Sequence, residues 1–71
     1  MSKKERIHNT VAALRQKRGI TQEALAEAVC VSRQTISALE KGNYTPSVLL
    51  AMKIASYFNT KVETLFYITH E

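Results

Sequence analysis

Residues 33–41 carry the side chains whose chemistry is the most informative in this sequence. Successive residues of a helix lie about 100° apart, so Ile36 and Leu39 would define one apolar side. The opposite side would be formed by short or polar side chains, namely Gln34, Lys41, Ser37 and Ala38. The amide of Gln34 suits the edge of an adenine, and the guanidinium of Arg33 suits a guanine or a phosphate. This slim and mostly uncharged face predicts a fit to a DNA major groove, which is roughly 12 Å wide.

The sequence offers no comparable set of residues for catalysis or metal binding. Its one cysteine, Cys30, cannot form an internal disulfide, and no Cys and His residues have the spacing of a zinc site. His8 and His70 are isolated from each other and from any carboxylate motif, so we expect both to be solvated or to cap helices. No Ser-His-Asp set or pair of catalytic carboxylates can be assembled. We therefore expect no enzyme, no cofactor, no metal and no small-molecule ligand.

Length and composition limit the chain to one small domain. A chain of 71 residues buries only about 60% of its unfolded surface, which excludes a large enzyme with its own substrate domain. Apolar residues make up 45% and charged residues 23%, which is typical of a globular domain. The longest apolar run, Val48 to Met52, is far shorter than the roughly 20 residues of a membrane span. The lone cysteine and the lack of a signal-peptide pattern predict a cytoplasmic protein without a membrane partner.

The positive charge is concentrated near the N-terminus. The whole chain has a net charge of +4, but residues 1–18 hold six basic residues against one acidic residue, whereas residues 19–71 hold four basic and five acidic residues. Such an asymmetry indicates a polyanionic partner, with nucleic acid as the first candidate.

Apolar periodicity and turn residues predict an all-α chain. The first helix would bury Ile7, Val11 and Leu14, and the fourth would be the central and most buried one. Thr21, Ser32 and Pro46-Ser47 would begin the second, third and fourth helices, and Thr60 to Glu63 matches a capping box for the fifth. The five expected helices cover about residues 6–17, 22–29, 33–41, 46–58 and a short segment with Val62, Leu65 and Phe66.

The second and third helices are joined by only two or three residues. Such short helices cannot lie antiparallel, so they must cross steeply and leave the second of the pair projecting from the body. This arrangement is a helix-turn-helix.

Two ordered stretches of the chain read Arg15-x-x-Arg18-Gly19-Ile20-Thr21-Gln22-Glu23-x-Leu25-Ala26 and Val31-Ser32-Arg33-Gln34-Thr35-Ile36-Ser37-x-Leu39-Glu40-Lys41-Gly42. Together with Pro46-Ser47, Lys53-Ile54-Ala55 and Val62-Glu63-x-Leu65-Phe66, they resemble the phage-repressor-like (Cro/xenobiotic-response) helix-turn-helix family over about residues 7–66. The resemblance implies a compact five-helix bundle of the lambda-repressor-like DNA-binding type. It also implies a sequence-specific, double-stranded DNA-binding transcriptional regulator.

The resemblance further implies which residues contact DNA. Gln22 would contact a backbone phosphate and orient the recognition helix, which is the helix over residues 33–41. Ala38 could offer a thymine methyl only an apolar contact. The positions for base edges and nearby phosphates are Ser32, Arg33, Gln34, Thr35 and Ser37. The positions for a loop that rests on phosphate are Lys41, Asn43 and Tyr44.

Other matched positions are expected to be structural. Ala26 and Ile36 correspond to a tight crossing of two helices, and the family pairs the positions of Arg15 and Glu40 as a half-buried ion pair. Cys30 departs from the family, which has glycine in this turn because the backbone there favours left-handed torsion angles.

We expect a basic N-terminal arm over residues 1–5, the DNA-binding domain over 6–66 and a tail over 67–71 that could contribute to a dimer contact. Phe66, Tyr67 and Ile68 exceed what a short helix can bury, so they are the candidates for a homodimer interface. The function predicted is repression by occupying a promoter. The alternative is an antitoxin or accessory module that acts with a second protein, and its mark would be an interface formed by these same three residues.

Overall fold

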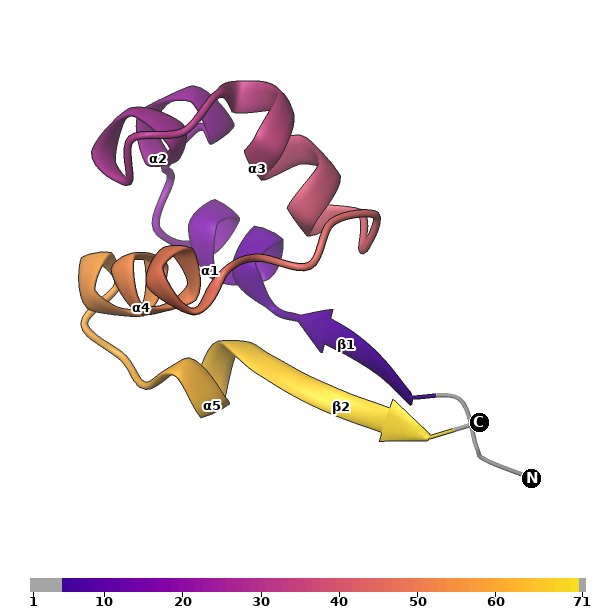
Figure 1. Cartoon of the computed structure of the whole chain (residues 1–71). Helices are drawn as coiled ribbons and strands as arrows, with labels where there is room; N and C mark the ends of the chain where they lie inside the picture. Colours follow the sequence, from indigo (N-terminus) through magenta and orange to yellow (C-terminus); the bar gives the residue numbers. More distant parts are fainter. Residues whose placement is uncertain (1–4, 71) are drawn as a thin grey trace.

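The computed structural model describes residues 5–70, which form five helices and one two-stranded antiparallel sheet (Figure 1). In chain order the elements are β1 (Glu5–Asn9), α1 (Val11–Lys17), α2 (Gln22–Ala28), α3 (Arg33–Glu40), α4 (Val48–Tyr57), α5 (Val62–Leu65) and β2 (Phe66–His70). Lys3 and Lys4 of the expected basic arm lie outside the described residues.

Hydroxyl side chains cap the N-termini of three of the helices. Thr21 accepts a hydrogen bond from the backbone N–H of Ala24 at 3.0 Å, and Ser32 accepts one from that of Thr35 at 3.1 Å. Ser47 does the same for Leu50 at 3.0 Å. Each bond satisfies a backbone donor that has no partner within its own helix. The predicted starts of α2, α3 and α4 are therefore confirmed.

The capping box predicted for the fifth helix is wrong. The residue that precedes α5 is Lys61, and no side-chain hydrogen bond caps this helix. Thr60 instead belongs to the end of α4, because its backbone N–H donates to the carbonyl of Ala55 at 2.9 Å and Asn59 before it has a φ of 54°.

The prediction of a purely helical chain is also wrong, because the two ends of the described chain pair as strands. β1 and β2 run antiparallel, with Ile7 opposite Ile68 and Asn9 opposite Phe66, and Figure 1 shows them extending away from the helices. Residues 6–9 therefore belong to a strand and not to the first helix. Phe66 leaves α5 in an extended conformation and begins the second strand.

Local interactions explain why the first helix begins so late. The side-chain oxygen of Asn9 accepts a hydrogen bond from the backbone N–H of Val11 at 3.1 Å, so α1 begins at Val11. The backbone N–H of Thr10 donates to the carbonyl of Leu65 at 2.9 Å and joins the two strands at their base. Aromatic and β-branched residues over 66–69 favour an extended chain on a half-buried surface.

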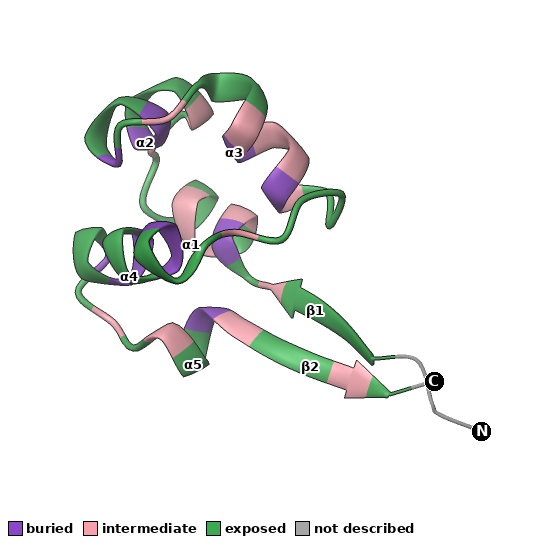
Figure 2. Ribbon diagram, viewed as in Figure 1, coloured by how far each residue is buried: buried purple, intermediate pink, exposed green. Residues whose placement is uncertain are grey.

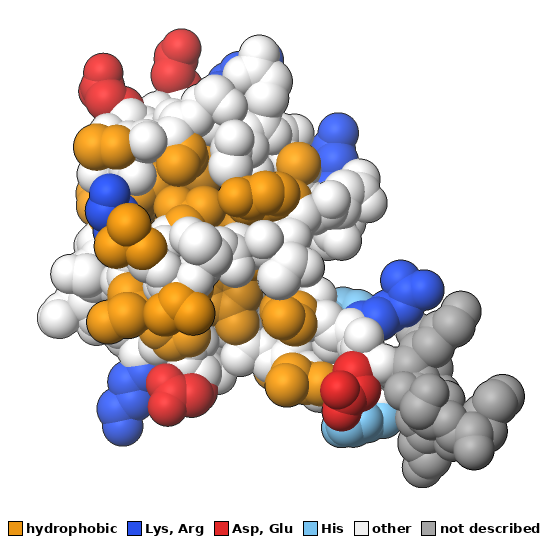
Figure 3. All heavy atoms as spheres, in the orientation of Figure 1, with side chains coloured by type: hydrophobic (Ala, Val, Ile, Leu, Met, Phe, Trp, Pro, Cys, Tyr) orange, Lys and Arg blue, Asp and Glu red, His pale blue; other side chains and the backbone are white. Residues whose placement is uncertain are grey.

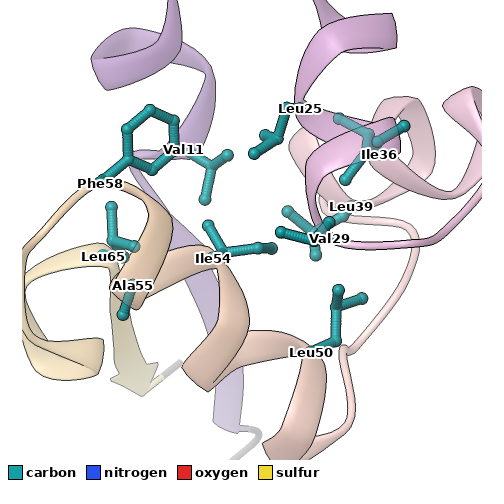
Figure 4. Close-up of a cluster of buried hydrophobic side chains, with 11 residues drawn as sticks. Val11, Leu25, Val29, Ile36, Leu39, Leu50, Ile54, Ala55, Phe58 and Leu65 are labelled. Atoms are coloured by element: carbon teal, nitrogen blue, oxygen red, sulfur yellow. The ribbon is translucent and has the colours of Figure 1, made fainter.

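The hydrophobic core lies among the five helices (Figures 2 and 4). Its largest fully buried side chains come from every helix and from the residue after α4: Phe58, Leu25, Ile36, Leu39, Ile54, Leu65 and Val11. Leu14 packs against this cluster, whereas Ile7, which was expected in the same buried stripe, is 44% exposed on β1.

The fourth helix is buried on one side only. It contributes four buried residues, Leu50, Ala51, Ile54 and Ala55, which is more than any other helix. Its other side leaves Val48 77%, Leu49 64% and Met52 58% exposed. The helix is therefore central, as expected, but a large apolar area of it faces outward.

Candidate nucleic-acid interface

A tight turn holds α3 at a steep angle to α2, and Figure 1 shows this pair at one end of the molecule. The backbone N–H of Val31 donates to the carbonyl of Ala26 at 3.0 Å, and Cys30 has a φ of 62°. This left-handed conformation is the one expected at Cys30 from its position in the helix-turn-helix. The Cys30 side chain is exposed and needs no space in the core.

The inward side of α3 consists of Ile36 and Leu39, both of which are fully buried. Ala26 of α2 belongs to the same buried cluster and is only 3% exposed. A side chain as small as that of Ala26 leaves room for α3 to pack against α2 in this cluster.

The outward side of α3 begins with exposed polar residues. Ser32, Arg33 and Gln34 are exposed, whereas Thr35 and Ser37 are half-buried (Figure 2). The hydroxyls of Ser32 and Thr35 lie 3.0 Å apart, and the Ser32 oxygen also caps the helix. Arg33 and Gln34 are therefore the long side chains that the first turn of α3 presents to solvent.

The segment after α3 is exposed but anchored. Lys41, Asn43 and Tyr44 are all exposed. Gly42 has a φ of 82°, and the backbone N–H of Asn43 donates to the carbonyl of Ala38 at 2.9 Å. The three predicted phosphate-contacting residues thus follow directly from the C-terminal end of the recognition helix.

An ion pair connects α3 to α1. Arg15 Nε lies 2.7 Å from Glu40 Oε2, and Arg15 Nη2 donates to Glu40 Oε1 at 3.2 Å. The exposed fractions of the two side chains are 11% and 5%. Arg15 Nη1 also donates to the carbonyl of Ile20 at 2.7 Å.

Gln22 has a partner that the sequence did not indicate. Its side-chain amide donates to Glu40 Oε1 at 2.9 Å, so the start of α2 is tied to the end of α3 through the same carboxylate. Gln22 is half-buried, and part of its hydrogen-bonding capacity serves the protein.

Asn9 is a second residue that sequence reasoning missed. Its side-chain N–H donates to the carbonyl of Leu39 at 2.9 Å, while its side-chain oxygen accepts from the backbone N–H of Val11 at the start of α1. One side chain thus fixes the base of β1 against the last turn of α3. Nothing in the sequence indicated this role, because the apolar spacing placed Asn9 inside the expected first helix.

The structure separates the three residues predicted for a dimer contact. Phe66 is half-buried, and Ile68 is 59% exposed on the same side of the sheet. Tyr67 faces the other way, where its ring stacks on His8 with centroids 5.5 Å apart.

An apolar groove of about 200 Å³ lies between α4, α5 and the sheet. No charged residue is among its lining residues, which are Ile7, Pro46, Ser47, Val48, Ala51, Met52, Val62 and Phe66. Figure 3 shows hydrophobic side chains gathered over this part of the molecule, with charged side chains toward the edges. The apolar circumference of the fourth helix was the sequence signal for this surface.

Within residues 5–70, no three His, Cys, Asp or Glu side chains lie together in a way that could hold a metal ion. None of the helices in this part of the chain has the length and hydrophobicity needed to cross a bilayer.

Known proteins are similar to this chain in sequence and in fold. A helix-turn-helix family model matches residues 11–65. The chain is 49% identical to the uncharacterized HTH-type transcriptional regulator YgzD of Bacillus subtilis, covering 89% of this chain and 96% of that protein. It is 51% identical to an uncharacterized HTH-type transcriptional regulator of Archaeoglobus fulgidus, covering 86% and 87% of the two chains. The crystal structure of the transcriptional regulator VanUg superimposes with a TM-score of 0.75 at 25% identity, covering 94% of this chain and 89% of that one. The resemblance seen in the sequence is thereby confirmed, and this chain belongs to the phage-repressor-like helix-turn-helix family of transcriptional regulators.

Proposed function

We propose that this protein binds double-stranded DNA sequence-specifically by placing α3 in the major groove. Arg33 and Gln34 read base edges there, and Ser32, Thr35 and Ser37 contact bases or nearby phosphates. Lys41, Asn43, Tyr44 and Gln22 contact the backbone and set the position of the helix. The proposal assigns no catalytic role to any residue and requires no cofactor.

The observation that carries this proposal is the fixed presentation of α3. Its inner side is buried, its last turn is held by the bonds of Arg15 and Gln22 to Glu40, and its outer side carries exposed polar groups. A preorganised helix loses little conformational freedom on binding.

Nuclear magnetic resonance tests this assignment on the free chain. A ¹⁵N-labelled sample titrated with duplex DNA should show its largest amide shifts in residues 32–44. An absence of shifts in residues 32–44 at saturating DNA would contradict the proposal. It would favour the antitoxin or accessory role instead, in which α3 contacts no DNA.

We further propose that the functional form is a homodimer formed through the apolar face. We define this face as the groove together with Ile68, whose side chain lies on the same side of the sheet. An uncharged face suits a second identical copy, because a two-fold axis pairs the same surface with itself. Phe66 and Ile68 belong to this contact in the proposal, and Tyr67 lies outside it.

Two copies would read two half-sites about 34–36 Å apart, one helical turn of DNA. Occupying a promoter in this way blocks transcription, so we propose that the protein is a repressor. Such a repressor acts on DNA in the cytoplasm.

A further inference from the structure

A polar cleft separates β1 from the segment that follows α3. It has a volume of about 440 Å³. Its lining residues come from these two parts of the chain: Glu5, Arg6, Ile7, His8, Lys41, Gly42, Asn43 and Thr45. Two of them, Lys41 and Asn43, contact the DNA backbone in the proposed function. The cleft therefore continues the proposed DNA-binding surface toward the sheet.

The cleft runs along β1, because residues from both faces of this strand line it. Side chains alternate between the two faces of a strand, so Arg6 and His8 share one face, and both are exposed. The ring of His8 stacks on Tyr67 with an interplanar angle of 21°, which holds the imidazole in place.

The charges of the cleft favour an anion. Arg6 and Lys41 supply two positive side chains from opposite walls. Among the described residues that line the cleft, Glu5 carries the carboxylate, and its Oε2 lies 3.5 Å from Nδ1 of His70 on the neighbouring strand. Backbone phosphate is the anion that a duplex would offer at this place.

The sheet is also fixed relative to the recognition helix. Asn9 donates to the Leu39 carbonyl at 2.9 Å and accepts from the Val11 N–H at 3.1 Å, so the base of β1 cannot shift without breaking a contact to α3 or α1. A phosphate bound between Arg6 and Lys41 would consequently lie at a fixed position relative to the bases that Gln34 contacts.

We propose that this cleft binds a backbone phosphate of the same duplex, outside the base pairs that α3 reads. The two-stranded sheet is then a second DNA-contacting element that lengthens the footprint of each protomer. This inference rests on the proposed function, because it needs α3 in the major groove to bring the duplex to the cleft.

The experiment measures how the dissociation constant depends on salt, from about 50 to about 200 mM, with two duplexes. One duplex contains only the selected binding site, and the other extends it by several base pairs on both sides. The variants are Arg6→Gln, Arg6→Lys and the matched control Lys61→Gln, which removes one exposed charge next to α5. Thermal melting of each variant establishes that it is folded.

For Arg6→Gln on the extended duplex, the slope of log K against log salt should fall by about one. The slope on the short duplex should hardly change. Arg6→Lys should keep the parental slope, because it keeps the charge, and Lys61→Gln should resemble the parent on both duplexes. Equal effects of Arg6→Gln and Lys61→Gln would overturn the inference while leaving the proposed function intact. Failure of the unsubstituted chain to prefer its selected site would overturn the proposed function itself.

Discussion

Glu40 is the residue on which the position of the recognition helix depends most. Both of its carboxylate oxygens have partners within the protein: Arg15 donates to Oε1 and Oε2, and Gln22 donates to Oε1. Its side chain is only 5% exposed, so solvent cannot replace a lost partner well. The bonds of Glu40 therefore hold α1, α2 and α3 together.

Replacing Glu40 with Ala should destabilise the domain strongly. The change leaves the guanidinium of Arg15 without its counter-charge, and breaking a buried pair costs roughly 3–5 kcal/mol. The control is Glu27→Ala, which removes an exposed carboxylate from α2. Urea unfolding measures the free energy of unfolding of both variants. The relative preference of Glu40→Ala among DNA sequences should stay the same at temperatures where this variant is folded. A Glu40→Ala variant as stable as the parent would show that the pair contributes nothing.

Substitutions of Gln34 and Lys41 should weaken DNA binding in two different ways. Gln34→Ala should cost about 1–3 kcal/mol and relax the preference at one base pair, because it removes contacts to a base edge. Lys41→Ala should weaken binding to all sequences alike, because it removes a phosphate contact. Fluorescence anisotropy with the preferred duplex and with each single-base variant measures the two patterns. A uniform loss from both changes would refute the assigned roles.

At the scale of elements, the turn between α2 and α3 holds a cysteine where the backbone favours glycine. Cys30 has a φ of 62°, and a residue with a Cβ adopts such a conformation at roughly 1–2 kcal/mol. Cys30→Gly should therefore raise the free energy of unfolding, by about 1 kcal/mol after the greater freedom of glycine in the unfolded chain is deducted. Cys30→Ala is the control, because it removes the thiol and keeps the strain.

The same pair of variants tests the thiol. We expect DNA binding by the parent to be insensitive to mild oxidant, because the cysteine serves only as a tolerated turn residue. If oxidant weakened the parent and left both variants unaffected, the thiol would be a redox-sensitive group.

The helices were predictable because their signals are local. Thr21 and Ser32 cap the helices that follow them, and Leu25, Val29, Ile36 and Leu39 recur at helical spacing on the buried sides. The sheet was missed because its two strands come from opposite ends of the described chain, and each is only five residues long. Ile7 also continues the spacing of Val11 and Leu14, so the period alone favoured a helix. What decides the boundary is the bond from Val11 to the side chain of Asn9.

The candidate interface was predictable to a similar degree. The outward position of Gln34 and the buried position of Ile36 both follow from helical geometry. The bond from Gln22 to Glu40 could not be predicted, because it joins two helices whose relative placement depends on the whole core. That Phe66 and Tyr67 lie on opposite faces could not be predicted either, because it depends on this segment being a strand and not a helix.

At the scale of the molecule, the polar and apolar surfaces have different tasks. Most of the positive excess of the sequence lies in residues 1–18, outside the recognition helix. We propose that this charge supplies the general attraction to DNA, and the nearly neutral face of α3 supplies the selection of sequence. The apolar face then remains for the second protomer.

Placing a charge on the apolar face should separate the two protomers. Met52→Asp puts a carboxylate on an exposed position that lines the groove, so it should leave the fold intact and weaken self-association. Lys53→Asp, on the same helix but outside the groove, is the control. Sedimentation equilibrium should show dimers for the parent and the control and monomers for Met52→Asp. A parent that is monomeric at all concentrations would contradict the homodimer.

Sequence-specific recognition by α3 is tested by selection of bound sequences from random duplex DNA at a stated salt concentration. The proposed function predicts an enriched palindrome with half-sites about one helical turn apart, and loss of that enrichment when Arg33 and Gln34 are both replaced by Ala. Recovery of sequences indistinguishable from the starting pool would contradict sequence-specific recognition by α3.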